Sequence, residues 1–429
     1  MTDPIRALIV GAGHRAMLYA SYAQLHPDEL QIVGVADPMV YRRDMVAQLY
    51  GLPPERCFTS AAEAADQPRF ADVAINGTMD HQHVPTSLPL LRAGYDILLE
   101  KPFATDEAEM WDLVRVAREE NRRVMICHVL RYAPFYVAIR QKIIDGEIGD
   151  LLTLETAEYV SYHHMAVAFV RGKWARKQYG YASMLMAKCC HDLDLIAWLK
   201  SGTKPVSVSS HGSNTQFRPE RAPKGAGTRC LIDCAIEPDC LYSARKHYLD
   251  HPDRWAFYVW DSLEHLAVPT MEDKVASLMG DSPYGRCVWK CDMDVVDHQA
   301  VLINFEDGAT ATHTMVGGAS RPGRSIHLVG TEGEIEGFME SGRFIVRHPD
   351  PRPGHEYAES VVDLAALEAS QGTHGGGDLR LVSDFLRVVR GEPPSISTTS
   401  LDDSVAGHLI GFSADRSMVE HRMVGLGPA

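Results

Sequence analysis

The chain lacks the features that mark several classes of protein. No apolar run approaches the roughly 20 residues that a membrane-spanning helix needs. Positive charge is scarce, with 42 Lys and Arg against 57 Asp and Glu, whereas nucleic-acid binding depends on clustered basic residues. The opening stretch, MTDPIRALIVGAG, contains no basic region followed by an apolar one, as a signal peptide would. We therefore expect no membrane, no nucleic-acid partner and no secretory leader.

Cysteine usage also argues against a disulfide framework. The nine cysteines are an odd number, which suits reduced thiols in a cytoplasmic protein. Five of them fall in one segment, at Cys230, Cys234, Cys240, Cys287 and Cys291. Their Cys-x3-Cys spacing departs from the usual zinc knuckle, so packed free thiols are favoured, with a structural zinc site as the alternative. We expect no catalytic metal.

A glycine-rich turn follows the first apolar run. The run Ile5–Val10 leads into GAGHRA, which begins at Gly11, and an amphipathic helix comes next. In this G-x-G-x-x-A pattern Gly11 permits a tight turn and Gly13 lets a pyrophosphate approach the backbone, while Ala16 allows close helix packing. The pattern predicts a dinucleotide site at this turn, with His14 and Arg15 beside the phosphates.

The next segments extend this unit into an α/β fold with a doubly wound parallel sheet. A second run ends at Asp37, where a carboxylate accepts hydrogen bonds from the adenosine ribose and repels a 2′-phosphate, so NAD is favoured over NADP. Arg42 and Arg43 follow closely and would soften that preference. Two further strands alternate with helices, and ligands bind beyond the carboxyl ends of such strands. Cofactor contacts are therefore also expected from Thr78, His81, His83, Glu100 and Lys101.

At EKPFA, residues 100–104, the chain resembles a known family. A strand that ends in Glu-Lys-Pro after a Rossmann unit, together with HVLRYAPFY at 128–136 and GGGDLRLVSDFLRVVRGEPP at 375–394, is similar to the Gfo/Idh/MocA oxidoreductases. This family includes glucose–fructose oxidoreductase and inositol dehydrogenase. Residues 220–300, rich in cysteine and aromatic residues, are the least typical part.

The resemblance implies an N-terminal Rossmann domain and a C-terminal α/β domain with an open, mostly antiparallel sheet. We expect the first domain at residues 1–128 and a domain for substrate binding and oligomerisation at 129–395. A C-terminal extension at 396–429 would pack back on both. The resemblance also implies a homodimer or a homotetramer.

The same resemblance implies catalytic residues. The family lysine corresponds to Lys101, which would stabilise an alkoxide and help to take its proton, and the family histidine corresponds to His191. The family aspartate four residues earlier is replaced by Ala187. Lys188 stands one turn before His191 instead, where its charge would favour a neutral imidazole or bind an anionic substrate group.

Candidate substrate contacts surround these residues. The stretch YHHMAVAFVRGKWARKQYG forms a basic region in an acidic chain, in which a tryptophan could stack on a sugar while cations meet an anionic group; a solvated loop or an oligomer contact is the alternative. The substrate-binding candidates are Arg131, Tyr132, His164, Arg171, Lys173 and Trp174.

These features predict an NAD-dependent oxidoreductase that acts on a secondary hydroxyl of a sugar, glycoside or cyclitol. The alternative is a redox-neutral NAD-dependent glycoside hydrolase. Some members of the family that the chain resembles oxidise C3 of a glycoside, eliminate the aglycone, add water and reduce the product. With the basic region, its substrate could carry an anionic group, as a sulfoquinovoside does.

Overall fold

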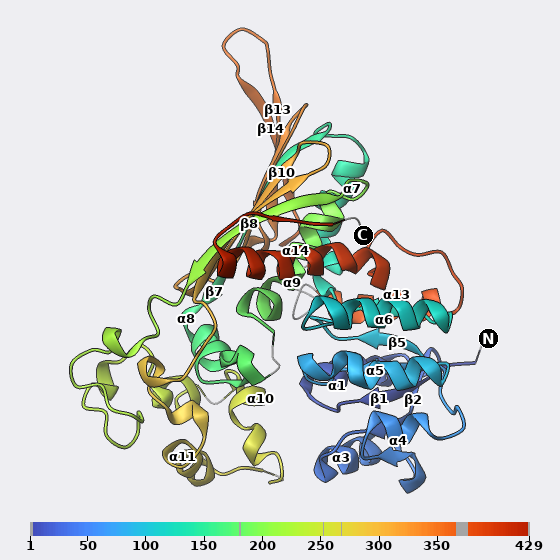
Figure 1. Ribbon diagram of the computed structural model, residues 1–429, viewed down its shortest axis with the longest axis vertical. Helices are drawn as coiled ribbons and strands as arrows, with labels where there is room; N and C mark the ends of the chain where they lie inside the picture. Colours follow the sequence, from blue (N-terminus) through green and yellow to red (C-terminus); the bar gives the residue numbers. More distant parts are fainter. Residues whose placement is uncertain (1–2, 180–181, 252, 267, 366–375, 428–429) are drawn as a thin grey trace.

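The computed structural model describes residues 3–179, 182–251, 253–266, 268–365 and 376–427. Gly375, which begins the GGGDLR motif, lies outside these ranges. Two sheets organise the chain, one in each half of the molecule (Figure 1). Within the described ranges, no helix combines the length and apolar character needed to cross a membrane.

The first sheet has six parallel strands in the order β3-β2-β1-β4-β5-β6. They are β1 (Ile5–Val10), β2 (Leu30–Ala36), β3 (Cys57–Phe58), β4 (Val73–Asn76), β5 (Asp96–Leu99) and β6 (Val124–Ile126). The helices around them are α1 (His14–Ala20), α2 (Tyr22–Leu25), α3 (Val40–Tyr50), α4 (Ala61–Ala65), α5 (His83–Arg92) and α6 (Glu107–Glu119). The order reverses between β1 and β4, where such sheets bind ligands. The predicted doubly wound Rossmann sheet is confirmed.

The second sheet has nine strands in the order β14-β13-β12-β11-β7-β10-β9-β8-β15. They are β7 (Leu151–Ser161), β8 (Pro205–Ser213), β9 (His298–Phe305), β10 (Thr310–Ala319), β11 (Gly323–Gly330), β12 (Glu334–Phe338), β13 (Arg343–Pro349), β14 (Tyr357–Asp363) and β15 (Val424–Gly425). Only the β7–β10 pair is parallel, so the sheet is mostly antiparallel, as predicted. β13 and β14 form a hairpin that projects from the top of the molecule in Figure 1.

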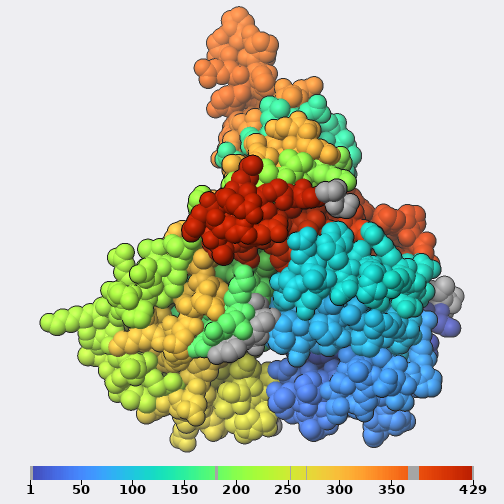
Figure 2. Space-filling model, viewed as in Figure 1, coloured from blue at the N-terminus to red at the C-terminus, as the bar shows by residue number. Residues whose placement is uncertain are grey.

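Helices join the two halves. The further α-helices in the described part of the chain are α7 (Pro134–Ile144), α8 (Tyr162–His164), α9 (Met184–Leu199), α10 (Ala256–Val259), α11 (Met271–Met279), α13 (Gly377–Val389) and α14 (Leu401–Glu420). The sequence boundaries assign α13 to the second domain, yet its Leu381 and Phe385 lie in the core of the first. α14 begins in the first domain's core at Leu401 and ends in the second's at Ala414, so it spans both (Figure 2).

A buried ion pair fixes α9 against the end of the first domain. The Arg131 guanidinium donates to both carboxylate oxygens of Asp194, at 2.7 and 2.6 Å. Both side chains are almost fully buried, so each charge depends on the other for its solvation. Arg131 also donates to the carbonyl of Thr398, which extends the junction to the segment before α14.

We predict that Asp194→Ala lowers the free energy of unfolding by roughly 3–5 kcal/mol, because it leaves the buried Arg131 charge without its partner. Asp402→Ala, which breaks the exposed Arg118–Asp402 pair, is the matched control and should cost less than about 1 kcal/mol. Equilibrium denaturation measures both. Equal losses in the two variants would contradict a structural role for the buried pair.

Candidate active site

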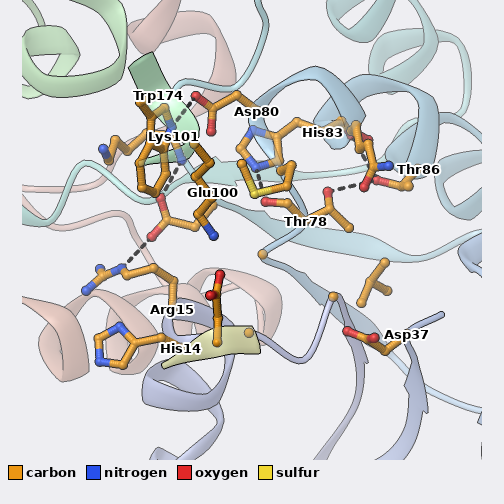
Figure 3. A pocket seen from close by; sticks show the side chains of 18 of the residues that line it. His14, Arg15, Asp37, Thr78, Asp80, His83, Thr86, Glu100, Lys101 and Trp174 are labelled. Carbon is orange, nitrogen blue, oxygen red and sulfur yellow. Dashed lines mark hydrogen bonds and ion pairs between the residues drawn. The ribbon is translucent and has the colours of Figure 1, made fainter. Parts of the chain in front are cut away.

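A cavity of about 1100 Å³ lies between the two domains, at the carboxyl ends of the first sheet's strands. Figure 3 shows the residues around it. It brings together fourteen of the predicted site residues, which are Gly11, Gly13, His14, Arg15, Asp37, Thr78, His83, Glu100, Lys101, His164, Lys173, Trp174, Lys188 and His191. From the second half, residues between His164 and Glu264, together with Arg324, line the cavity.

The glycine-rich turn has the geometry of a dinucleotide cradle. Gly11 adopts φ +74°, and a Cβ there would stand 2.9 Å from the backbone of Thr78. A Cβ on Gly77 would stand 2.8 Å from that of Ala16. Ala16, the third small residue of the pattern, therefore packs directly against the backbone that follows β4. At Gly13 the nearest atom to an added Cβ is 3.8 Å away. The backbone there faces open cavity, and a side chain would fill the space that a pyrophosphate needs.

Asp37 lies at the carboxyl end of β2, where its carboxylate organises the neighbouring loops. It is 2% exposed and accepts hydrogen bonds from the backbone N–H of Ala12 and of Met39, each at 2.8 Å. Because each carboxylate oxygen keeps a free lone pair, the group can still accept from ribose hydroxyls. The residues of this half of the cavity therefore fit a dinucleotide with an unmodified adenosine ribose.

The buried carboxylate of Glu100 connects three parts of the cavity wall. Its Oε1 accepts from Arg15 Nε at 2.7 Å and from Tyr19 at 2.6 Å, and its Oε2 accepts from the Lys101 backbone N–H at 2.7 Å. Arg15 also pairs with Asp378 at 2.6 Å, at the start of α13. Glu100 thus joins the glycine-rich helix to the Glu-Lys-Pro turn, whose Lys101–Pro102 peptide bond is cis.

The charge of Glu100 is strongly stabilised. Burial alone would raise the pKa of this carboxyl, but the charges of Arg15 and Lys101 and the hydrogen bonds that it accepts outweigh burial. Its pKa falls from 4.5 to about 2, so the group is ionised at neutral pH. The carboxylate acts here as an anchor for cations and donors, because it has no proton to give.

Lys101 and α9 meet at the centre of the cavity. The Lys101 ammonium donates to the carbonyl of Ala187 at 2.9 Å, and His191, one turn further along α9, lines the same cavity and is 7% exposed. Ala187 stands where the family resemblance implies an aspartate. Its backbone carbonyl, instead of a side chain, holds the lysine in this chain.

Lys188 also lines the cavity, but its charge is shared with the second sheet. Its ammonium lies 3.0 Å from Glu158 on β7, and Glu158 also pairs with Arg324 on β11 at 2.9 Å. Arg324 binds Asp192 on α9 at 2.9 Å. Lys188 is therefore one member of a four-charge network. The negative charge of Glu158 offsets part of the positive charge that Lys188 brings to the cavity.

Aromatic side chains enclose the substrate half. The Trp174 indole donates to Asp80 of the first domain at 3.0 Å, which closes the two domains on each other, and Figure 3 shows this bond beside Lys101. His164 stacks on Trp255 with ring centres 4.2 Å apart. Burial, together with the nearby Lys188 charge, holds the pKa of His164 well below its ordinary value, so a neutral imidazole faces the cavity.

Four predicted site residues lie outside the cavity lining. Arg131 pairs with Asp194, and Tyr132 donates to Asp384 at 2.8 Å, so both belong to the junction between the domains. Arg171 is 3% exposed and donates to the backbone carbonyls of Tyr242 and Arg286. His81 lies between Asp80 and Gln82, which line the cavity, but is not itself among the lining residues. We assign these four residues to the framework of the protein.

Within the described residues, the five cysteines of the cysteine-rich segment form no group of three thiols close enough to hold a metal ion. In the described part of the chain, the one group of three candidate metal ligands within 4.8 Å of one another is Cys189, Asp192 and His313. It contains none of the five cysteines of residues 220–300, which are free thiols. Asp192 in that group is already bound to Arg324, so its charge is balanced by protein.

The sequence did not indicate several residues that shape the cavity. They are Asp80, Phe257, Tyr258, Asp261, Glu264 and Arg324. Phe257 and Tyr258 belong to the aromatic stretch HYLDHPDRWAFYVW, whose density of aromatic side chains is a signal for part of this set. The structure places residues 255–264, which we call the roof segment, over the cavity.

Two family patterns match most of the chain, both named GFO_IDH_MocA. One, described as oxidoreductase family, NAD-binding Rossmann fold, matches residues 5–128. The other, described as oxidoreductase family, C-terminal alpha/beta domain, matches residues 140–401. The cradle around Gly13 and Asp37 is thus part of an NAD-binding domain.

Individual proteins are similar over most of their length. YteT of Bacillus subtilis (strain 168), described as an oxidoreductase, is 24% identical over 364 residues, 83% of this chain and 81% of YteT. Levoglucosan dehydrogenase, solved with NADH and levoglucosan, has a TM-score of 0.70 at 16% identity over 99% of this chain and 100% of its own. The WlbA dehydrogenase from Bordetella pertussis, solved with NADH and UDP-GlcNAcA, has a TM-score of 0.70 at 15% identity, covering 100% and 99%. At these identities the structures show a shared fold.

We predict that Glu100→Gln lowers the free energy of unfolding by roughly 3 kcal/mol at pH 7, since a pKa depressed from 4.5 to about 2 corresponds to that amount. The stabilisation by a depressed carboxyl is complete above its unfolded pKa and is lost as pH falls through the folded one. The difference between wild type and variant should therefore shrink below pH 4.5. Denaturation at a series of pH values measures it, and a difference that stays constant down to pH 3 would contradict this assignment.

Proposed function

The chain belongs to the Gfo/Idh/MocA family of NAD-binding oxidoreductases, and on this premise we propose that it oxidises a secondary hydroxyl of a sugar, glycoside or cyclitol. The observation that carries the proposal is the convergence of Lys101 and His191 on the cavity that also contains the Gly13 and Asp37 cradle. A proton-handling pair beside a dinucleotide site is the arrangement that alcohol oxidation requires.

In the proposed mechanism Lys101 and His191 divide the work on the substrate hydroxyl. The Lys101 ammonium, now bound to the Ala187 carbonyl, would turn one of its three protons to the hydroxyl oxygen and stabilise the negative charge that develops there. The His191 imidazole would accept the hydroxyl proton. NAD, when bound, supplies the acceptor for the hydride that leaves the same carbon. The products are a ketone, a protonated histidine and the reduced cofactor.

Glu100 would support this step without transferring a proton. Its ionised carboxylate lies beside the Arg15 and Lys101 charges and accepts from the Lys101 backbone N–H, so it fixes the backbone that carries the lysine. A charged donor held in position before reaction needs no reorganisation when charge develops on the substrate. Lys188, already paired with Glu158, would orient the substrate from the other side.

The cavity supports a carbohydrate as substrate. The faces of Trp174 and Trp255 line it, and aromatic faces suit the C–H face of a sugar ring. His164 and Lys173 offer hydrogen bonds to hydroxyl groups from the same wall. Two proteins with this fold were solved with levoglucosan and with UDP-GlcNAcA, and the second of these ligands is consistent with an anionic substituent on the substrate.

The net reaction is tested by incubating the purified enzyme with NAD and a panel of free sugars, cyclitols and aryl glycosides, including an aryl sulfoquinovoside. We expect NADH to accumulate in stoichiometric amount with ketone product, because no second substrate reoxidises the cofactor. Absorbance follows NADH and the released aglycone together. Aglycone release in large excess over NADH, abolished when NAD is stripped, would replace this proposal with the redox-neutral glycosidase.

We expect Lys101→Met to lower kcat by roughly 10²- to 10⁴-fold, because it removes the donor that stabilises the developing alkoxide. The affinity for NAD, measured by calorimetry, should change by less than about threefold, since the cradle is untouched. Lys204→Met, at an exposed lysine of the second domain, is the matched control and should keep wild-type turnover. Unchanged turnover in Lys101→Met would refute the assigned role.

A further inference from the structure

Two donors at the beginning of α3 converge on one carboxylate from the other domain. The Tyr41 hydroxyl donates to Glu264 Oε2 at 2.6 Å, and the Arg42 guanidinium donates to the same oxygen at 3.0 Å. Burial and the bond to Glu264 raise the pKa of Tyr41 to about 12, so the hydroxyl remains a donor at neutral pH. A phenol, a guanidinium and the first turn of an 11-residue helix form a site for an anion.

This anion site borders the adenosine end of the cofactor cradle. Arg42 Nη1 lies 3.9 Å from Asp37 Oδ2, and it is the nearest atom to a Cβ built on Gly13, at 3.8 Å. Both Arg42 and Glu264 line the cavity. A guanidinium in this position, beside the carboxylate that receives the ribose hydroxyls, is where NADP-binding enzymes of this architecture hold the 2′-phosphate.

Arg43, the other arginine of this turn, is not free to contact a 2′-phosphate as Arg42 is. It donates to the backbone carbonyls of Asp37 and Pro38, at 2.6 and 3.1 Å, and so holds the loop that carries the acidic residue. Arg42 is therefore the cation that faces the ribose position, and Glu264 is its partner.

The roof segment places Glu264 by contacts of its own. Phe257 stacks on His14 of the glycine-rich turn, with ring centres 4.1 Å apart and planes at 12°. Trp255 adopts φ +58° at the start of α10 and stacks on His164. Since two aromatic stacks fix the segment on both sides of the cavity, the carboxylate at its end is held beside α3.

We propose that Glu264 of the roof segment sets the preference of the enzyme for NAD over NADP. Its carboxylate takes the two donors that would otherwise bind a 2′-phosphate, and it adds a second negative charge beside Asp37. NADP can use Tyr41 and Arg42 only by displacing Glu264, whereas the 2′-hydroxyl of NAD leaves the pair intact. This inference concerns cofactor recognition alone and holds whichever sugar is the substrate and whichever net reaction is catalysed.

The test is the affinity of Glu264→Gln for NAD and for NADP, measured by calorimetry without substrate. We expect the affinity for NADP to rise by roughly tenfold or more, the scale of one freed charge-assisted phosphate contact, while that for NAD changes by less than about threefold. The fragment 2′,5′-ADP should show the same gain relative to ADP. Glu272→Gln, in α11 outside the cavity lining, makes the same charge change and should leave the ratio unaltered.

Arg42→Ala combined with Glu264→Gln decides the mechanism. Because the gain depends on the freed guanidinium, it should disappear in the double variant. The proposal is overturned if NADP affinity in Glu264→Gln equals that of wild type, if it rises equally for NAD, or if the gain survives the loss of Arg42. Glu264→Ser provides a second variant should the glutamine keep the contacts of the acid. NAD binding in every variant reports that the cradle is folded, so the outcome is independent of turnover.

Discussion

The site depends on the hydrogen bonds and ion pairs that the buried carboxylate of Glu100 makes. This carboxylate holds Arg15 of the glycine-rich helix, the hydroxyl of Tyr19 and the backbone of Lys101, and through Arg15 it reaches Asp378 near the other end of the chain. A charge with so little solvent must be surrounded by donors, and the donors here come from the glycine-rich helix and the Glu-Lys-Pro turn, while Asp378 of the returning helix accepts a further bond from Arg15. One electrostatic requirement therefore fixes three segments relative to one another.

α9 transmits this arrangement to the second domain because its faces have different partners. Ala187 binds Lys101 of the first domain and Asp194 binds Arg131 at the junction of the two domains. Lys188 and Asp192 pair with charges on the second sheet. His191 lies between these contacts, at the cavity. The helix is held by ion pairs on both sides, so the position of the histidine follows from the docking of the domains. Cys189 and Cys190, which are adjacent in this helix, are buried in the core and belong to none of these ion pairs.

Local sequence patterns made the first domain predictable, whereas contacts between residues distant in sequence could not be predicted. The conformation of Gly11 and the place of Asp37 follow from the strand–turn–helix rhythm, and the structure has both where the sequence puts them. Arg171 was predicted to bind substrate because cations in a basic region suggest anionic ligands, and Arg131 because the family resemblance implies substrate contacts just past the Rossmann unit. Their partners, a carboxylate 63 residues away and carbonyls 71 and 115 residues away, leave no local trace. Glu264 was not predicted as a site residue for the same reason.

The roof segment makes cofactor and substrate share a cover. Phe257 rests on His14 at the cofactor turn, Trp255 faces the substrate wall, and Trp174 is tied to Asp80 across the domains. Any path for exchange of the dinucleotide must break contacts that also enclose the substrate. Where such contacts keep solvent out, fixed charges act at greater strength than in water. Covering the cavity and placing charge are thus linked in this structure, because the roof segment that lines the cavity also carries Glu264, the carboxylate that binds Tyr41 and Arg42.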